Sequence, residues 1–392
     1  SVLYNERDKM VMSLIKNNQP ELLLLLSILQ ADTNIVSPPN IDWQLFYKLV
    51  IRHRIWHQVH KALPETNTPI FPWITKRCQQ DTLHLLSTAN ETVRIAVKLK
   101  EQQVEHCFMK GILLNLHLYG GLNTRPCRDI DVWIKPSDYA RAINVLISLG
   151  YIKKLPTYEL TGFKQSYYMQ HRHDMAFYHP DKRILIEPHF RLDYFGINFF
   201  PWGLLTRKSI RVFNQDIMTL EDNYHLLYLM IHGSIHAWIR LRWLQDIVLF
   251  IQSNKCDLNH IMDLAKQIKC EHLVEQTLLI VHDLFPTCRA SIASVIQNPS
   301  HKSLQLAALA KQFIEGDYEM TDGFRHYKMF FKYRYYLAKL AVKGQKRQAI
   351  FGDLFKIDEV FQYATFPDKL AFMYYLVYPL WVIKYAWQSL RR

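Results

Sequence analysis

The spacing of hydrophobic residues is helical in the first hundred residues of the chain. An apolar run covers residues 20–30, and Asp42 stands as an N-cap before a helix whose apolar positions continue to Pro64. Residues 81–103 again place apolar side chains near one helical face. The pattern predicts an N-terminal helical region over residues 1–103.

The middle of the chain changes to short apolar runs bounded by turn residues, a pattern typical of strands. Helical spacing separates these runs and takes over again towards the C-terminus. We therefore predict a fold of class α+β, with a mixed β-sheet core over residues 104–205 and a helical domain over 206–392. Strands are expected at 104–109, 130–134, 167–169 extending through 175–178, and 183–190, and helices at 111–119 and 136–150.

The charge balance favours anionic partners. The 392 residues carry a formal net charge of +13, which suits nucleotides, nucleic acid or an acidic membrane face, although a lysine-rich soluble surface explains the charge equally well. The stretch Arg325–Arg347 holds eight Lys or Arg, six Tyr or Phe and no acidic residue. It fits phosphate contacts with base stacking, an amphipathic helix on a membrane, or a helix with an aromatic core face.

Cysteine usage and hydropathy indicate a cytoplasmic protein. None of the six cysteines forms a C-x-x-C pair, and Ser1–Asp8 lack a signal-peptide pattern. The longest uncharged C-terminal run, Leu370–Ile383, is shorter than the roughly 20 residues that a spanning helix needs. We expect no transmembrane span, and a packed C-terminal helix over 372–387 rather than a membrane anchor.

Two aspartates carry the clearest chemical signal. Asp129 and Asp131 alternate with apolar residues on a predicted strand, so both side chains point to one face and favour a cation between them. Glu187 interrupts another apolar strand, where a charge is costly unless it is paired or bound to metal. If the two strands lie side by side, the three carboxylates predict a two-metal magnesium site, with Mn²⁺ as an alternative ion.

The turn upstream of the aspartates suits phosphate. Gly111 lets phosphate approach the backbone at a helix N-terminus, and Lys110 or Arg128 can neutralise its charge. The other interpretation is an ordinary strand-to-helix turn, with Asp129 and Asp131 capping a loop or pairing with Arg125 and Arg128.

These residues together resemble a known family. Met109–Gly111, Arg125–Asp131 and the strand with Glu187 and His189 are similar to the DNA polymerase beta-type nucleotidyltransferases, and more narrowly to a bacterial family of uncharacterised nucleotidyltransferases. The resemblance covers roughly residues 40–255. It implies a five-stranded mixed sheet, metal-binding aspartates at Asp129 and Asp131, and a third carboxylate at Glu187. Lys110-Gly111 departs from the Gly-Ser or Gly-Gly that the superfamily often shows.

Several histidines and arginines are further candidates. His189 lies on the face of Glu187 and can orient a carboxylate or the substrate. His232 and His236 are one helical turn apart and either bind zinc or line a nucleotide cleft. Arg240 and Arg242 either reach phosphate or pair with Asp246, and we assign Arg242 to nucleotide binding.

The resulting hypothesis is a metal-dependent enzyme that moves a nucleoside monophosphate, most readily AMP from ATP, to a hydroxyl acceptor with release of pyrophosphate. A protein side chain, a tRNA end and a small metabolite are all open as acceptors, and the basic stretch favours an anionic one. A non-catalytic nucleotide- or RNA-binding module and a membrane-peripheral interaction protein are the alternatives.

Overall fold

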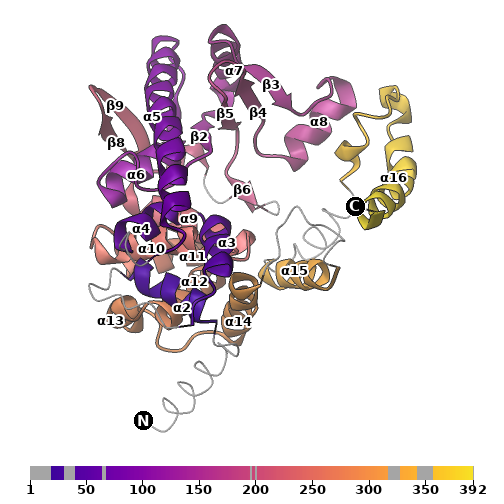
Figure 1. Cartoon of the computed structure of the whole chain (residues 1–392). Coiled ribbons are helices and arrows are strands. Elements are labelled where there is room, and N and C mark those ends of the chain that lie inside the picture. The colour runs from indigo at the N-terminus through magenta and orange to yellow at the C-terminus, as the bar shows by residue number, and fades with distance from the viewer. Residues whose placement is uncertain are drawn as a thin grey trace. The chain divides into compact units, whose positions relative to one another are not determined.

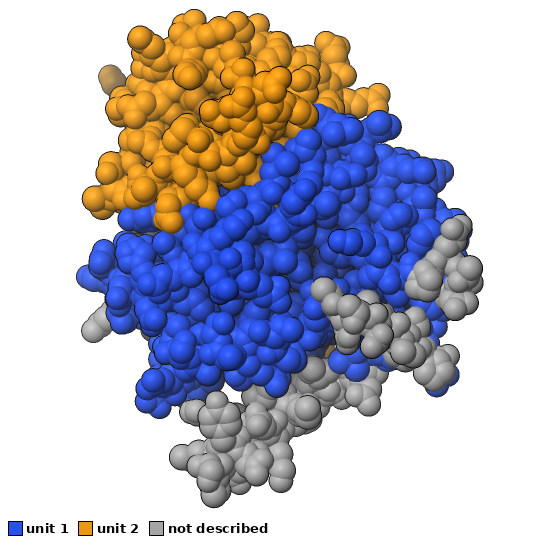
Figure 2. All heavy atoms as spheres, turned by 90° about the vertical axis from the view of Figure 1, so that its left-hand side faces the viewer, with its two compact units in different colours: residues 1–86, 115–126, 222–317 blue, residues 87–114, 127–221, 318–392 orange. Residues whose placement is uncertain are grey.

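The predicted α+β class is confirmed. The computed structural model describes residues 19–30, 40–63, 68–194, 197–198, 201–316, 327–341 and 356–391. The chain forms two compact units, coloured separately in Figure 2. Unit 1 comprises residues 1–86, 115–126 and 222–317, and unit 2 comprises residues 87–114, 127–221 and 318–392. The three-part division at residues 103 and 205 stays a prediction.

Unit 2 is built on a seven-stranded mixed sheet with the order β3-β4-β5-β2-β1-β9-β8. β2 pairs in parallel with β5, and β1 pairs antiparallel with β2 and in parallel with β9. The central strands are rich in apolar residues and almost entirely buried, as expected for strands covered on both faces. The strands are β1 His106–Met109, β2 Asp129–Ile134, β3 Ile152–Leu155, β4 Ala176–His179, β5 Ile184–His189, β8 Arg207–Val212 and β9 Gln215–Leu220.

Two features of the sheet differ from expectation. The hairpin of β8 and β9 extends it beyond the five strands that the resemblance implied, and Thr219 Oγ1 donates to the Phe108 carbonyl at 2.9 Å where β9 joins β1. The predicted strand over 167–169 is wrong, because these residues lie in helix α8, Gly162–His171. Tyr167 and Tyr168 are both buried there, and a helix can bury neighbouring residues that alternation across a strand would separate.

The described elements of unit 1 are helices, and the short strand pair β6 Asp193–Tyr194 and β7 Ile197–Asn198 belongs to unit 2. The helix predicted from Asp42 to Pro64 is two helices. Asp42 does cap the first one, but Arg54 adopts a left-handed φ of 57° and ends it. Unit 1 contains α2 Pro20–Leu29, α3 Trp43–His53, α4 Trp56–Ala62, the first part of α5 Phe71–Glu101, α9 Asp222–Ile235, α10 Leu241–Gln252, α11 Leu258–Gln267, α12 Glu271–Leu284, α13 Arg289–Ala293 and α14 His301–Glu315.

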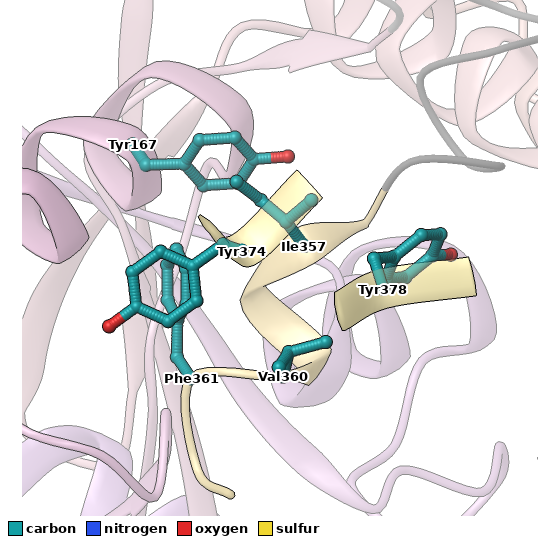
Figure 3. Close-up of a cluster of buried hydrophobic side chains, with 6 residues drawn as sticks. All are labelled: Tyr167, Ile357, Val360, Phe361, Tyr374 and Tyr378. Carbon is teal, nitrogen blue, oxygen red and sulfur yellow. The ribbon is translucent and has the colours of Figure 1, made fainter. Parts of the chain in front are cut away.

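A C-terminal segment completes unit 2 by packing on α8. Figure 3 shows Tyr167 of α8 beside Ile357, Phe361 and Tyr374, and all are buried. The Phe361 and Tyr374 rings meet edge to face, with centroids 4.6 Å apart. Arg172, just after α8, donates from Nε to Asp358 Oδ2 at 2.8 Å. Aromatic packing and a charged hydrogen bond therefore fix residues 357–374 beside the sheet-edge helix seen in Figure 1.

Helix α16, Met373–Arg391, packs along one face only. Tyr374 and Tyr378 are buried, whereas Leu376 and Leu380 are 61% and 67% exposed. This fits the prediction of a packed C-terminal helix for one face of α16. No helix among the described residues is both long and apolar enough to cross a membrane.

A buried ion pair organises unit 1. Arg125 donates from Nε and Nη2 to the two oxygens of Asp246, each at 2.7 Å, and Tyr119 donates its hydroxyl to Oδ1 at 2.7 Å. Asn115 Nδ2 donates to the Arg125 carbonyl at 2.7 Å. Arg125 thus pairs with Asp246.

Removing one partner of this ion pair is expected to lower the free energy of unfolding more than replacing both partners. Arg125→Met leaves Asp246, which is fully buried, without its counter-charge, and should lower the free energy of unfolding by about 3–5 kcal/mol. The double variant Arg125→Met/Asp246→Leu should recover most of that loss. Urea unfolding measures both, and a double variant as unstable as the single one would contradict the prediction.

Candidate functional site

The pairing of β2 with β5 brings the predicted carboxylates together. Asp131 on β2 lies level with Glu187 on β5, and Asp129 is paired with Leu185, two positions earlier. Because partners on adjacent strands point to the same face, Asp129, Asp131 and Glu187 share one face of the sheet. Asp131 is buried, and the other two are partly exposed. The sheet places three carboxylates where a solvent-accessible cation can reach them.

Lys110 and Gly111 form the turn from β1 into helix α6, Gly111–Tyr119. Both residues have positive φ, 50° and 56°, and a Cβ on Gly111 would lie 3.3 Å from Cys127 Sγ. The turn directs Lys110 Nζ to within 3.3 Å of Asp131 Oδ1. The ammonium group therefore lies against the carboxylate that the sequence assigned to metal binding.

His189 joins the carboxylates on the same sheet face. Its Nε2 atom lies 3.2 Å from Asp131 Oδ1. One ligand atom each from Asp131, Glu187 and His189 lies within 4.8 Å of the others. Carboxylate oxygens suit Mg²⁺ and Mn²⁺, and an imidazole nitrogen is a ligand that divalent transition metals accept. The donor set fits a divalent cation, with Asp129 as a further carboxylate outside this tight group.

Charge and burial change the pKa values of Asp131 on β2 and Glu187 on β5 in opposite directions. Desolvation, together with Asp131 and Asp129, raises the pKa of Glu187 to about 8. Burial opposes ionisation of Asp131 too, but Lys110 and His189 outweigh it and hold the pKa of that carboxyl below its ordinary value. Burial lowers the pKa of His189, but its hydrogen bond to Asp131 and the charges of Asp174 and Asp131 together outweigh burial and raise that pKa above its ordinary value. The site combines an ionised Asp131 with a Glu187 that readily holds a proton.

Two residues near the site were not singled out as candidates. Asp174 forms an isolated bridge with His189 of β5, and His173 stacks on the His189 ring with centroids 5.5 Å apart. Ligand atoms of His173, Asp174 and His189 also come within 4.8 Å of one another. Asp174 lies two residues before β4, and the period of two along that strand could have indicated it.

The remaining predicted residues are less directly placed. Arg128 is exposed just before β2. Arg242 belongs to unit 1, where it donates to the Pro126 carbonyl, so its role in nucleotide binding stays a prediction. The rings of His232 and His236 lie 4.5 Å apart and both contact Trp243. Neither belongs to the two potential metal groups found among the described residues.

A large cavity lies within unit 1. It encloses about 1180 Å³ and is lined by, among others, His57, Gln58 and Gln245. None of the three carboxylates lines it. By contrast, the hollow lined by Lys110, Gly111, Asp129 and Asp131 measures only about 10 Å³. Lys110 therefore lies against Asp131 on this side of the carboxylate.

The raised pKa of Glu187 predicts an unusual pH dependence of stability without metal. The folded protein binds more protons than the unfolded chain between about pH 4.5 and 8, so its free energy of unfolding falls as pH rises through this window. Relative to Glu187→Gln, wild-type protein in chelator should lose about 2 kcal/mol or more between pH 5 and pH 8.5. Urea unfolding of both proteins measures this, with the exposed Glu101→Gln as control. An equal difference at both pH values would refute it.

Comparison with known proteins places the chain in a family. No curated protein matches it. A solved structure from Paracoccidioides brasiliensis, titled an antigenic nucleotidyltransferase-like protein, is similar over 54% of this chain and 96% of that chain, with 14% identity and a TM-score of 0.36, too low to carry an argument. A family model described as uncharacterised nucleotidyltransferase matches residues 39–286, which include Asp129, Asp131 and Glu187. The chain therefore belongs to this family of uncharacterised nucleotidyltransferases.

Proposed function

We propose that the protein transfers a nucleoside monophosphate from a nucleoside triphosphate to a hydroxyl acceptor in a metal-dependent reaction that releases pyrophosphate. The observation that carries the proposal is the register that sets Asp131 level with Glu187, with Asp129 on the same face. Membership of the nucleotidyltransferase family supports it. Cytoplasmic location and ATP as the preferred donor remain part of the proposal.

Asp129, Asp131 and Glu187 would hold one or two Mg²⁺ or Mn²⁺ ions. When bound, such ions activate the attacking hydroxyl and neutralise charge on the phosphates. Asp131 suits this role because it stays ionised beside Lys110 and His189. His189, through its contact with Asp131 Oδ1, orients that carboxylate.

Glu187 would take the proton of the acceptor hydroxyl. Without metal, burial and the neighbouring aspartates raise its pKa to about 8, so this carboxylate has a higher affinity for a proton than an ordinary glutamate. A hydroxyl that loses its proton to Glu187 attacks the α-phosphorus, and the bond from that phosphorus to the pyrophosphate oxygen breaks. Group transfer of this kind depends on positioning and charge neutralisation.

Lys110 and Gly111 would bind the phosphates. Lys110 Nζ, which lies 3.3 Å from Asp131 Oδ1, would turn to a phosphate oxygen of the bound nucleotide. Gly111 opens helix α6 with no Cβ, so a phosphate can approach its backbone, where the helix dipole favours negative charge. Arg128 is exposed near this turn and can add a further positive charge.

The basic stretch Arg325–Arg347 supports an anionic acceptor only weakly. Its described part contains α15, Tyr327–Leu340, in which Tyr333 and Tyr336 are buried while Phe331 and Tyr335 are exposed. Part of its aromatic content therefore serves packing. Residues 325–326 and 342–347 lie outside the described residues.

Loss of a single carboxylate tests the proposal. Asp131→Asn keeps the size of the side chain but removes its charge, and should lower pyrophosphate release with Mg²⁺ and ATP by about a thousandfold. Asp129→Asn and Glu187→Gln should also lose most activity. Colorimetric detection of pyrophosphate, with each triphosphate and a metabolite, protein or tRNA acceptor pool, measures the rate.

Asp181→Asn is the matched control, because Asp181 is an exposed aspartate in the turn between β4 and β5. It should release pyrophosphate at the wild-type rate. The proposal fails if wild-type protein releases none with any triphosphate and pool, and Asp131→Asn binds nucleotide and Mg²⁺ as wild type does.

A further inference from the structure

A second cavity opens directly at the proposed catalytic carboxylate. It encloses about 260 Å³ within unit 2, and Glu187 is part of its lining. One wall comes from the segment after β3 and from α8, and the opposite wall comes from residues 358–362 of the C-terminal segment. The aromatic cluster of Figure 3 fixes that second wall, because Ile357, Val360 and Phe361 are buried against α8. The cavity is therefore a built feature of the folded unit.

The cavity is short of positive charge. Leaving Glu187 aside, its lining contains the carboxylates of Asp174, Asp358 and Glu359 but only one cationic side chain, Arg172. Arg172 Nη2 lies 2.6 Å from Asp358 Oδ2 and 3.7 Å from Glu359 Oε1. Asp174 has no lysine or arginine partner among the described residues, and its ion pair is with His173 at 3.8 Å. Arg172 thus pairs with two of these three carboxylates, and Asp174 is left to a histidine.

The walls also offer groups suited to a small polar ligand. The hydroxyl oxygen of Tyr158 is buried at the cavity and has no hydrogen-bond partner among the described residues. A buried hydroxyl is normally bonded, and the described residues supply no partner for this one. Tyr158 and Tyr168 also add aromatic side chains to the lining, and aromatic rings attract ammonium groups.

We propose that this cavity binds the acceptor, and that the acceptor is a small molecule that carries both a hydroxyl and an ammonium group. The inference rests on the proposed nucleotidyl transfer. Its volume corresponds to roughly eight or nine waters at about 30 Å³ each, which suits a metabolite. The acidic lining repels the phosphates of a tRNA end and attracts a cation.

The lining of the cavity orients the acceptor for the reaction. The ammonium group lies among Asp174, Asp358 and Glu359, and the hydroxyl lies at Glu187. The hydroxyl oxygen forms a bond to the α-phosphorus while the phosphorus–oxygen bond to pyrophosphate breaks, and the hydroxyl proton passes to Glu187. The products are a phosphodiester of the amino alcohol with the nucleoside monophosphate, pyrophosphate and one proton.

A paired acceptor panel tests the inference. Ethanolamine, 2-amino-1,3-propanediol and glucosamine are each compared with their N-acetyl partner, which keeps the hydroxyl and removes the charge. Both binding by calorimetry and nucleotidyl transfer from ATP with Mg²⁺ are measured on the full chain. We expect at least one amine to be favoured over its partner by about tenfold or more. Equal behaviour of every pair in both measurements would overturn the inference.

Substitutions of the acidic residues that line the cavity test which side chains cause the preference for an amine. Glu359→Gln should reduce the ratio of amine to N-acetyl affinity by about three- to tenfold, and Asp174→Asn/Glu359→Gln should abolish it. The ratio is measured on one protein sample, so partial loss of folded protein cancels. Glu159→Gln, an exposed glutamate that does not line the cavity, is the matched control and keeps the wild-type ratio. A preference that survives the double variant would contradict the placement.

Failure of the acceptor inference can be told from failure of the proposed function. If Asp131-dependent pyrophosphate release occurs with neutral or anionic acceptors and no amine is favoured, only the acceptor class is wrong. If Asp131→Asn changes neither nucleotide binding nor pyrophosphate release, the nucleotidyl-transfer proposal itself is wrong.

Discussion

The site depends on repulsion between carboxylates that the sheet does not allow to separate. Backbone hydrogen bonds between β2 and β5 hold Asp131 level with Glu187, and the alternation along β2 adds Asp129 to the same face. A shift of one residue would turn one strand's carboxylates to the other face. The buried apolar residues between them, such as Ile130 and Ile186, prevent this shift. Burial of the apolar core therefore stabilises a strand register that holds several carboxylates together on one face of the sheet.

Neighbouring cationic groups neutralise the carboxylates unequally, and this difference gives the carboxylates separate roles. Asp131 receives both Lys110 and His189, whereas Glu187 faces the other carboxylates with little direct help. The positive φ at Lys110 is what directs its ammonium group back over the strand. A backbone conformation that most residues avoid is thus part of the electrostatics of the site.

Sequence reasoning could predict the centre of the sheet but not its edges. β1, β2 and β5 are apolar runs, and β2 carries two aspartates at a period of two, so these strands and the common face of Asp129 and Asp131 follow from local pattern. β8 and β9 carry polar and charged residues, and they join the sheet through the pairing of β9 with β1 and of β8 with β9. Asp174, Arg172 and the carboxylates of 358–359 meet through contacts between segments far apart in sequence, which no local spacing reveals.

The long sequence separation within unit 2 also has a consequence for synthesis. The strands that hold the three carboxylates are complete once the ribosome has passed His189, but the wall of the smaller cavity waits for Phe361. At about 5–20 residues per second, the interval is on the order of ten seconds or more. During that time the nascent chain presents Tyr167 of α8 without the C-terminal side chains that pack on it. The nascent chain at this stage thus resembles a protein truncated before its C-terminal segment. A factor that shields apolar surface on the ribosome would bind this face of α8.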